Sequence, residues 1–238
     1  MTKLIFFDTE TTGNESKDFL CQIAFKTGEE SFVGFYKPPL KIPPEASAVH
    51  HITNKMIADA PAFKESPDSK KIKQLFEHND SVVVAHNAPF DLMIIAKENI
   101  VPTKFICTLR VARELDSEGK IERYNLQYLR YLLDLDVEAV AHNALGDVLV
   151  LEKLFERLKN KLIKEEGLSE DAAIEKMVEI SSHPSIFRTM NFGKHNGKKI
   201  EEVLASDRGY LEWLLAQKLE SDQIEDDWIY TLKHHLEK

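Results

Sequence analysis

The sequence predicts an α/β fold with a mixed five-stranded sheet flanked by helices. Three apolar runs near the N-terminus follow one another through short turns, which favours an antiparallel meander; they are Lys3–Asp8, Leu20–Lys26 and Ser31–Tyr36. Two later runs, Ser81–Ala85 and Lys104–Cys107, alternate with helical segments, as the strands of parallel crossover units do. Antiparallel strands followed by parallel strands therefore indicate a mixed sheet.

Helical periodicity accounts for most of the chain after the third strand. Helices are expected over Ser66–His78, Ala88–Glu98, Thr108–Leu115, Leu126–Leu133 and Asn143–Leu162. The last of these helices has an apolar stripe for the core and gives way to a charged segment that finishes in Gly167. Ser169 can then cap a further helix, which Pro184 terminates.

The first strand ends in a pair of carboxylates, Asp8 and Glu10. Side chains alternate along a strand, so these two project from one face while Thr9 projects from the other. Two adjacent acids at the mouth of a buried strand repel each other and lose hydration, which requires a compensating charge. Oxygen ligands suit Mg²⁺ and Mn²⁺. The alternative is a strand that simply runs into a polar turn.

Two later segments add acids at comparable positions. Asp91 lies in the first turn of the helix that follows the fourth strand, where it could face a site or interact only with the helix dipole. Asp147 lies at the edge of the apolar stripe of the long helix, where a carboxylate has no reason to be. His142 precedes that helix and can point the same way, although a partly buried structural histidine is the simpler interpretation of that residue alone.

Together these segments read D-x-E, N-A-x-F-D and H-x4-D, in that order. The pattern resembles the histidine branch of the DEDD superfamily of exonucleases, which includes DnaQ-like proofreading exonucleases and exodeoxyribonuclease-X-like proteins. The tyrosine branch has a tyrosine four residues before the last aspartate, where this chain has Asn143. The resemblance covers about residues 3–160 and implies a ribonuclease-H-like fold.

The same resemblance implies a metal-dependent 3′→5′ exonuclease that releases nucleoside 5′-monophosphates. Two divalent metal ions, Mg²⁺ or Mn²⁺, would be held by carboxylates, with His142 as the general base toward the attacking water. The implied catalytic and metal-binding set is Asp8, Glu10, Asp91 and Asp147, together with His142.

Further substrate contacts are implied near the first motif. Thr11, Thr12 and Gly13 occupy positions that hold the terminal nucleotide in relatives. His51 replaces a glycine in a segment that usually reads histidine-glycine-isoleucine-threonine; it could narrow the pocket, stack on a base or be an exposed turn residue. Phe90 could pack against the terminal nucleotide or fill the core.

The chain from residue 187 onward predicts a small C-terminal α+β module. Its F-G-K-x-x-G-K and Y-L-x-W-L patterns resemble a module of exodeoxyribonuclease-X-like proteins, and Asn196-Gly197 predicts a hairpin turn. The module is either a DNA-docking element or a structural appendage. In the first case DNA phosphates would bind the cations around the turn, Lys194, His195, Lys198 and Lys199. Tyr210 and Trp213 are expected to fill the module's own core, and the acidic stretch Glu220–Asp227 is expected to face solvent.

Length and charge agree with a catalytic domain over residues 1–165, a helical linker over 166–186 and the module over 187–238. A chain of 238 residues, 43% hydrophobic, can bury a sizeable core. Its net charge of −9 does not exclude a nucleic-acid substrate, because metal ions neutralise the acids and a few nucleotides need no wide basic face.

The sequence favours a cytoplasmic protein. No segment resembles a signal peptide or has the length needed to span a membrane, so no membrane partner is expected. Cys21 and Cys107 lie in apolar runs without metal-ligand spacing and are expected to be reduced core thiols.

The expected function is DNA hydrolysis in proofreading, repair or end-trimming, and the C-terminal module favours DNA over RNA as the substrate. Which replication or repair partner the protein has, if any, is left open by the sequence. Two alternatives stay open: an RNA-trimming exonuclease of the same fold, and a nucleic-acid-binding protein without catalytic activity.

Overall fold

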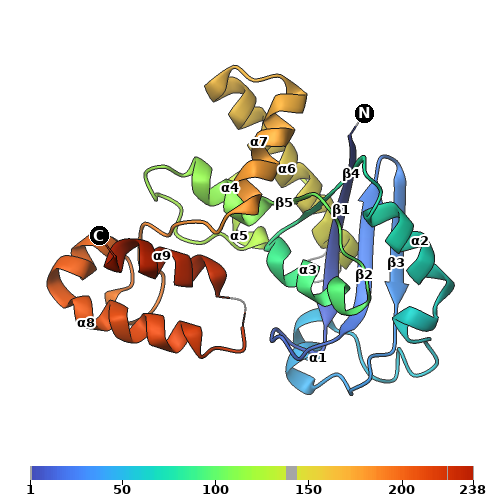
Figure 1. The fold of residues 1–238 in the computed structure, drawn as a ribbon. Coiled ribbons are helices and arrows are strands. Elements are labelled where there is room, and N and C mark those ends of the chain that lie inside the picture. The colour runs from blue at the N-terminus through green and yellow to red at the C-terminus, as the bar shows by residue number, and fades with distance from the viewer. Residues whose placement is uncertain (1, 138–143, 224, 238) are drawn as a thin grey trace.

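The computed structural model describes residues 2–137, 144–223 and 225–237. Its centre is a five-stranded sheet in the order β3-β2-β1-β4-β5 (Figure 1). The strands are β1 (Lys3–Thr11), β2 (Leu20–Thr27), β3 (Glu30–Phe35), β4 (Ser81–Ala85) and β5 (Phe105–Cys107). β1 pairs with β2 in the antiparallel sense and with β4 in the parallel sense, so the predicted mixed sheet is confirmed.

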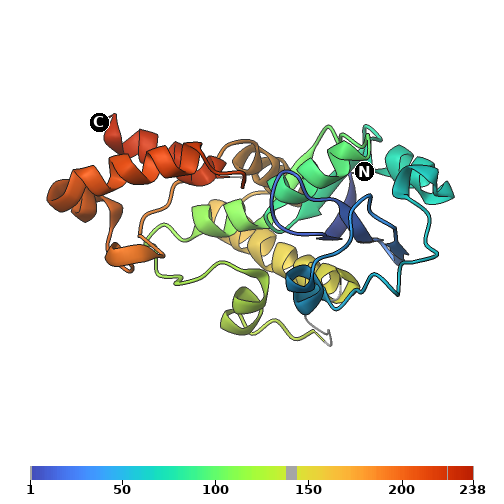
Figure 2. The same cartoon turned by 90° about the horizontal axis from the view of Figure 1, so that it is seen from below.

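Helices cover both faces of this sheet. Their bounds are α1 (Pro44–His50), α2 (Pro67–Phe76), α3 (Ala88–Lys97), α4 (Thr108–Leu115), α5 (Leu126–Leu132), α6 (Ala144–Glu166), α7 (Glu170–Ser182), α8 (Ile200–Leu219) and α9 (Asp226–Leu236). Figure 2 shows α3 and α6 on opposite sides of the sheet. Within the described ranges, no helix combines the length and the apolarity that crossing a membrane requires.

The alternation of side chains along β1 assigns each residue to one of the two cores. Phe6 faces α6 and meets Phe155 edge-on, with ring centroids 5.2 Å apart. Its neighbour Phe7 faces the opposite core, where it meets Phe76 of α2 at the same distance. Because β1 is the middle strand and both its faces are covered, its C-terminal end is the point where helices from both layers converge.

Helix α7, in the segment expected to act as a linker, packs against the sheet domain. Ala173 and Met177 are fully buried in the same core as α6. The hydroxyl of Ser181 accepts a hydrogen bond from the Cys107 backbone N–H at 2.8 Å. The chain therefore leaves the sheet domain only after this helix.

The C-terminal module is built from α8 and α9, which pack on each other (Figure 1). Its core contains Trp228 of α9, which stacks on Phe187 with ring centroids 4.1 Å apart. The expectation that Trp213 fills this core is wrong, because that side chain is 54% exposed on α8. Tyr210, by contrast, is partly buried against the core.

The Asn196-Gly197 turn differs from the predicted hairpin in its geometry. Asn196 has φ −49° and ψ 131°, and only Gly197 has a positive φ, 83°, as in a type II turn. A single bridge between Thr189 and Lys199 is the β pairing present in the described part of the module.

Truncating the packed face of α6 should destabilise the domain strongly. Leu151 is 1% exposed in the core shared by β1 and α6. We expect Leu151→Ala to lower the free energy of unfolding by about 2–5 kcal/mol, because apolar burial is removed and a cavity is left behind. Leu40→Ala is the matched control, because Leu40 is 60% exposed and its truncation should change stability by about 0.5 kcal/mol or less. Urea denaturation measures both; equal losses would contradict this description of the core.

Candidate active site

Three carboxylates converge where β1 ends. Asp8 and Glu10 follow Phe6 at intervals of two residues and therefore project from the same face, toward α6. Helix α6 contributes Asp147 from its first turn. One carboxylate oxygen from each residue lies within 4.8 Å of the other two. The structure thus brings together three of the four acids that the sequence motifs single out.

Asp91 reaches the same strand end from the opposite face. Thr9 projects toward α3, and both its backbone N–H and its hydroxyl donate to Asp91 Oδ1, at 3.1 and 2.6 Å. Asp91 is 4% exposed and lies in the first turn of α3. The backbone of one strand therefore separates Asp91 from the three clustered acids. The charge of Asp91 nevertheless raises the pKa values of Asp8 and Glu10.

Burial and mutual repulsion raise the pKa values of these acids. The pKa of Asp8 lies well above its ordinary value, because of burial first and then the charges of Asp91, Glu10 and Asp147. Burial, followed by the charges of Asp147 and Asp91, raises the pKa of Glu10 to about 8. Burial raises the pKa of Asp91 to about 7, against the hydrogen bonds from Thr9 that favour its ionised form.

The donor set fits a hard divalent cation. Among the described residues, neither Asp8 nor Glu10 forms an ion pair with a lysine or an arginine, so the protein itself does not balance their charge. Carboxylate oxygens at this separation can share a cation, and a bound cation would reverse the pKa shifts that repulsion produces.

The residues after the first motif form a tight strap beside the acids. Thr11 donates to the Gly13 carbonyl at 2.5 Å, and Thr12 donates to Asp18 Oδ1 at 2.7 Å. A Cβ atom at Gly13 would lie 2.6 Å from the Asp18 carboxylate, so any larger residue would have to displace that side chain. Thr11 and Thr12 are buried and bonded within the chain. Their contact with a nucleotide stays a prediction.

His51 lies outside the buried part of the site. It ends α1 in the left-handed conformation, with φ 63°, and its side chain is exposed. A glycine adopts this conformation without strain, which explains the glycine that the resemblance places there. The neighbouring His50 is buried instead: its Nε2 donates to the Thr11 carbonyl at 3.1 Å, and its Nδ1 accepts from Ile52 N–H at 3.0 Å. His50 therefore ties this segment to the end of β1.

Two polar residues that the motifs did not single out support the site. Gln127 of α5 donates through Nε2 to Asp147 Oδ1 at 2.6 Å. His86, which follows β4, is bonded through Nε2 to the Tyr124 carbonyl at 2.6 Å and so fixes the segment before α5. Burial lowers the pKa of His86 to about 4, so its imidazole is neutral. In both contacts the two partners lie more than 15 residues apart in the sequence, so a local sequence motif could not have predicted them.

The remaining predicted site residues have separate outcomes. His142 lies outside the described residues, so its role as a general base stays a prediction. Phe90 is partly buried against the core formed by α2 and α3.

In the C-terminal module, Lys194 and His195 both contact Asp207, at 2.7 and 2.9 Å, and His195 is buried. Lys198 and Lys199 are exposed.

The expectation that the acidic stretch faces solvent is wrong for Asp227. Its carboxylate is 16% exposed and forms ion pairs with Arg110 and Arg113 of α4. A single acid in a run of acids gives no sequence signal of its partner, because the two arginines lie more than 110 residues earlier.

This sheet order, with acids from β1, α3 and α6 at the end of the central strand, defines a ribonuclease-H-like nuclease domain. Residues 5–155 match the family model described as Exonuclease, and residues 190–218 match the Exodeoxyribonuclease X-like C-terminal model. The first match covers more than half of the chain. The protein belongs to the exonuclease family.

Individual relatives agree with this assignment. Exodeoxyribonuclease 10 of Escherichia coli strain K12 is 31% identical over 204 residues, which cover 84% of this chain and 82% of that protein. DNA polymerase III subunit epsilon of Treponema pallidum is 31% identical over 175 residues, covering 68% of this chain and 78% of that protein. A solved structure of exonuclease X in complex with 5′ overhanging duplex DNA superposes with a TM-score of 0.58 at 26% identity, over 75% of this chain and 99% of that one.

The raised pKa values predict a stability that falls as pH rises when no divalent cation is present. Glu10 keeps its proton to about pH 8 in the folded protein, whereas its ordinary pKa is 4.5. Between these values the unfolded chain binds fewer protons than the folded one, so the free energy of unfolding decreases with pH. Thermal unfolding in EDTA, from about pH 5 to about pH 8, measures this as a falling Tm.

The Glu10→Gln variant is the control for that measurement. It keeps the side-chain shape but cannot titrate, so its Tm should fall less steeply over the same pH range. Mg²⁺ should raise the Tm of the unmodified protein most at the upper end of the range, where the carboxylates are ionised. A pH slope that is identical in the two proteins would show that Glu10 has an ordinary pKa.

Proposed function

We propose that this protein is a metal-dependent 3′→5′ exonuclease that removes nucleoside 5′-monophosphates from DNA. The observation that carries the proposal is the acid cluster of Asp8, Glu10 and Asp147, with Asp91 across the strand, on the fold of the exonuclease family. DNA is favoured as the substrate because a relative that aligns with 84% of this chain bears the name exodeoxyribonuclease. Proofreading, repair or end-trimming are the roles in which such an activity is used.

The role of each residue in the site follows from its charge and its position. Asp8, Glu10 and Asp147 would hold divalent ions, Mg²⁺ or Mn²⁺, and Asp91 would contribute from the other side of β1. When bound, such ions supply charge neutralisation at the phosphate and a water of lowered pKa. Gln127 keeps the Asp147 carboxylate in place by donating to one of its oxygens. The acids otherwise repel a phosphodiester, so placement of the scissile phosphate beside them depends on their neutralisation.

His142 would accept the proton of the attacking water at an imidazole nitrogen. Thr11, Thr12, Gly13, His51 and Phe90 would line the position of the terminal nucleotide, next to the strap after β1.

We also propose the organisation of the chain into a catalytic domain (1–165), a helical linker that packs against it (166–186) and the C-terminal module (187–238). The unpaired, buried thiols of Cys21 and Cys107 suit a cytoplasmic protein.

The direct test is cleavage of 5′-labelled oligonucleotides with Mg²⁺ or Mn²⁺. Single-stranded DNA, duplex DNA with a recessed 3′ end, and RNA are compared, and we expect a ladder that shortens from the 3′ end of DNA. Asp8→Asn and Asp147→Asn should each abolish cleavage with the fold retained, because each removes a charged metal ligand without changing side-chain volume. Fastest cleavage of RNA would assign the enzyme to RNA trimming. Binding without cleavage of any substrate would indicate a non-catalytic protein.

A second test isolates the general base. His142→Ala should lower the rate by about 10²–10⁴, the usual contribution of a positioned acid or base. Metal affinity, measured by titration calorimetry, should stay unchanged, since the carboxylates hold the ions. Loss of metal affinity in His142→Ala would instead assign this histidine to the metal site.

A further inference from the structure

The C-terminal module is held on the catalytic domain by a buried ionic contact. Asp227 accepts from Arg110 Nε at 3.1 Å and forms a second ion pair with Arg113. It also accepts from the backbone N–H and the hydroxyl of Ser185, at 3.0 and 2.9 Å. Both oxygens of this carboxylate are thus occupied, and both arginines belong to α4. This contact therefore joins α9 of the module to α4 of the catalytic domain.

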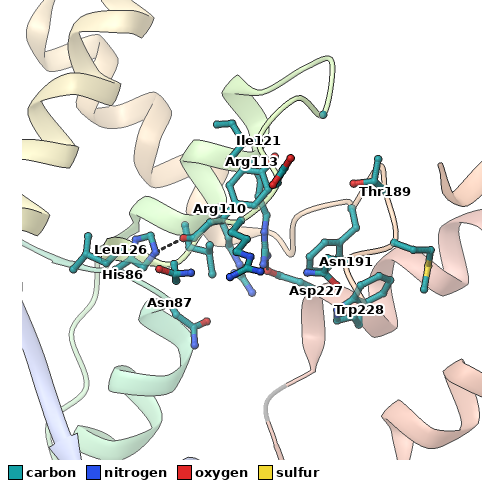
Figure 3. Close-up of a pocket in the computed structure, with 18 of the residues that line it drawn as sticks. His86, Asn87, Arg110, Arg113, Ile121, Leu126, Thr189, Asn191, Asp227 and Trp228 are labelled. Atoms are coloured by element: carbon teal, nitrogen blue, oxygen red, sulfur yellow. Dashed lines mark hydrogen bonds and ion pairs between the residues drawn. The ribbon is translucent and has the colours of Figure 1, made fainter. Parts of the chain in front are cut away.

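A cleft of about 1010 Å³ lies between the two parts of the chain. Figure 3 looks into it: His86, Asn87 and Leu126 lie on the side of the catalytic domain, and Thr189, Asn191 and Trp228 on the side of the module, with the two arginines between them. The volume lies at the upper end of pockets that enclose drug-sized ligands, about 300–1,000 Å³. A cleft of this size offers room for a short stretch of one nucleic-acid strand.

Two elements connect the lining of the cleft to the acid cluster. Asn87 lines the cleft and immediately precedes α3, whose first turn carries Asp91. Leu126 lines the cleft and begins α5, whose next residue, Gln127, donates to Asp147. A strand whose 3′ end lies at the acids would therefore enter the cleft with its upstream nucleotides.

The lining of the cleft suits a polyanion better than the surface of the whole protein does. The chain carries a net charge of −9, yet four cationic and four acidic side chains balance each other among the described residues that line the cleft. Asn125, Asn191 and Asn196 add amide groups, and Tyr124 and Trp228 add aromatic surface. Arg123 forms no side-chain hydrogen bond or ion pair with any described residue, so its guanidinium is available to a phosphate.

We propose that this cleft binds the single-stranded nucleotides that lie 5′ of the scissile phosphate, and that the C-terminal module serves as its second wall. The inference rests on the proposed exonuclease function and adds where the rest of the strand is held. The proposal also replaces the expectation that Lys194 and His195 of the basic turn contact DNA. Lys194 and His195 are held by Asp207, whereas Asn196 and Gly197 of the same turn line the cleft.

Blocking the cleft tests this assignment. Cys21 and Cys107 are 0% exposed, so a cysteine introduced by Asn196→Cys is the site that reacts with biotin maleimide in the folded protein. The labelled variant should hydrolyse a thymidine dinucleotide at the unmodified rate. It should lose about tenfold or more in kcat/KM on a 16-nucleotide oligothymidine, because the label prevents upstream bases from stacking in the cleft. Lys70→Cys, on α2 and exposed, receives the same label as the matched control and should leave both substrates unaffected.

A charge reversal gives an independent measurement. Arg123→Glu should weaken binding of the 16-mer. It should also make the negative slope of log K against log salt shallower by about 0.7 for each phosphate that the arginine neutralises. Lys70→Glu should change neither the affinity nor the slope. Fluorescence anisotropy in EDTA measures this binding without cleavage, so the cleft is tested even if the protein proves inactive on every substrate. Unchanged binding and unchanged turnover of the 16-mer in both cleft variants would overturn the proposal. An equal loss on the dinucleotide and the 16-mer would overturn it too.

Discussion

The mutual repulsion of partly buried carboxylates at the end of β1 is the constraint on which the rest of the site depends. Asp8, Glu10 and Asp147 place three acids within 4.8 Å, and burial weakens the solvent screening that would otherwise separate their charges. Such a cluster is stable only when protons or cations balance it. The fold provides no lysine or arginine for Asp8 or Glu10 in its described part, and the balance is thereby left to ions that can also bind phosphate.

The sheet order explains how one short strand assembles this cluster. β1 lies between β2 and β4 in the middle of the sheet, and a core packs on each of its faces. Period-two alternation then sends Asp8 and Glu10 toward α6 and Thr9 toward α3. Each helix brings one further acid in its first turn, Asp147 from α6 and Asp91 from α3. The site is a consequence of packing two layers on a single strand end.

The sequence predicted what depends on local periodicity and missed what depends on distant contacts. The sheet and the acid pair on β1 follow from alternation and from short turns, which neighbouring residues determine. Trp213 and Trp228 could not be distinguished in this way, because each lies on an apolar helical segment and only the packing of α8 on α9 decides which is buried. Asp227 was assigned to solvent for the same reason: its arginines are remote in sequence. Gln127 carries no motif, yet it contacts Asp147 directly.

Contacts between residues far apart in the sequence also connect the C-terminal module to the acid cluster. Helix α4, which holds Asp227 through Arg110, begins directly after β5, and the hydroxyl of its first residue, Thr108, lies 2.9 Å from His86 Nδ1. His86 in turn fixes the segment that leads to Gln127. A series of hydrogen-bonded and covalently linked groups therefore connects the module to Asp147. A catalytic domain that needed only the acids would not require this series, whereas an enzyme that must align an incoming strand with its acids would.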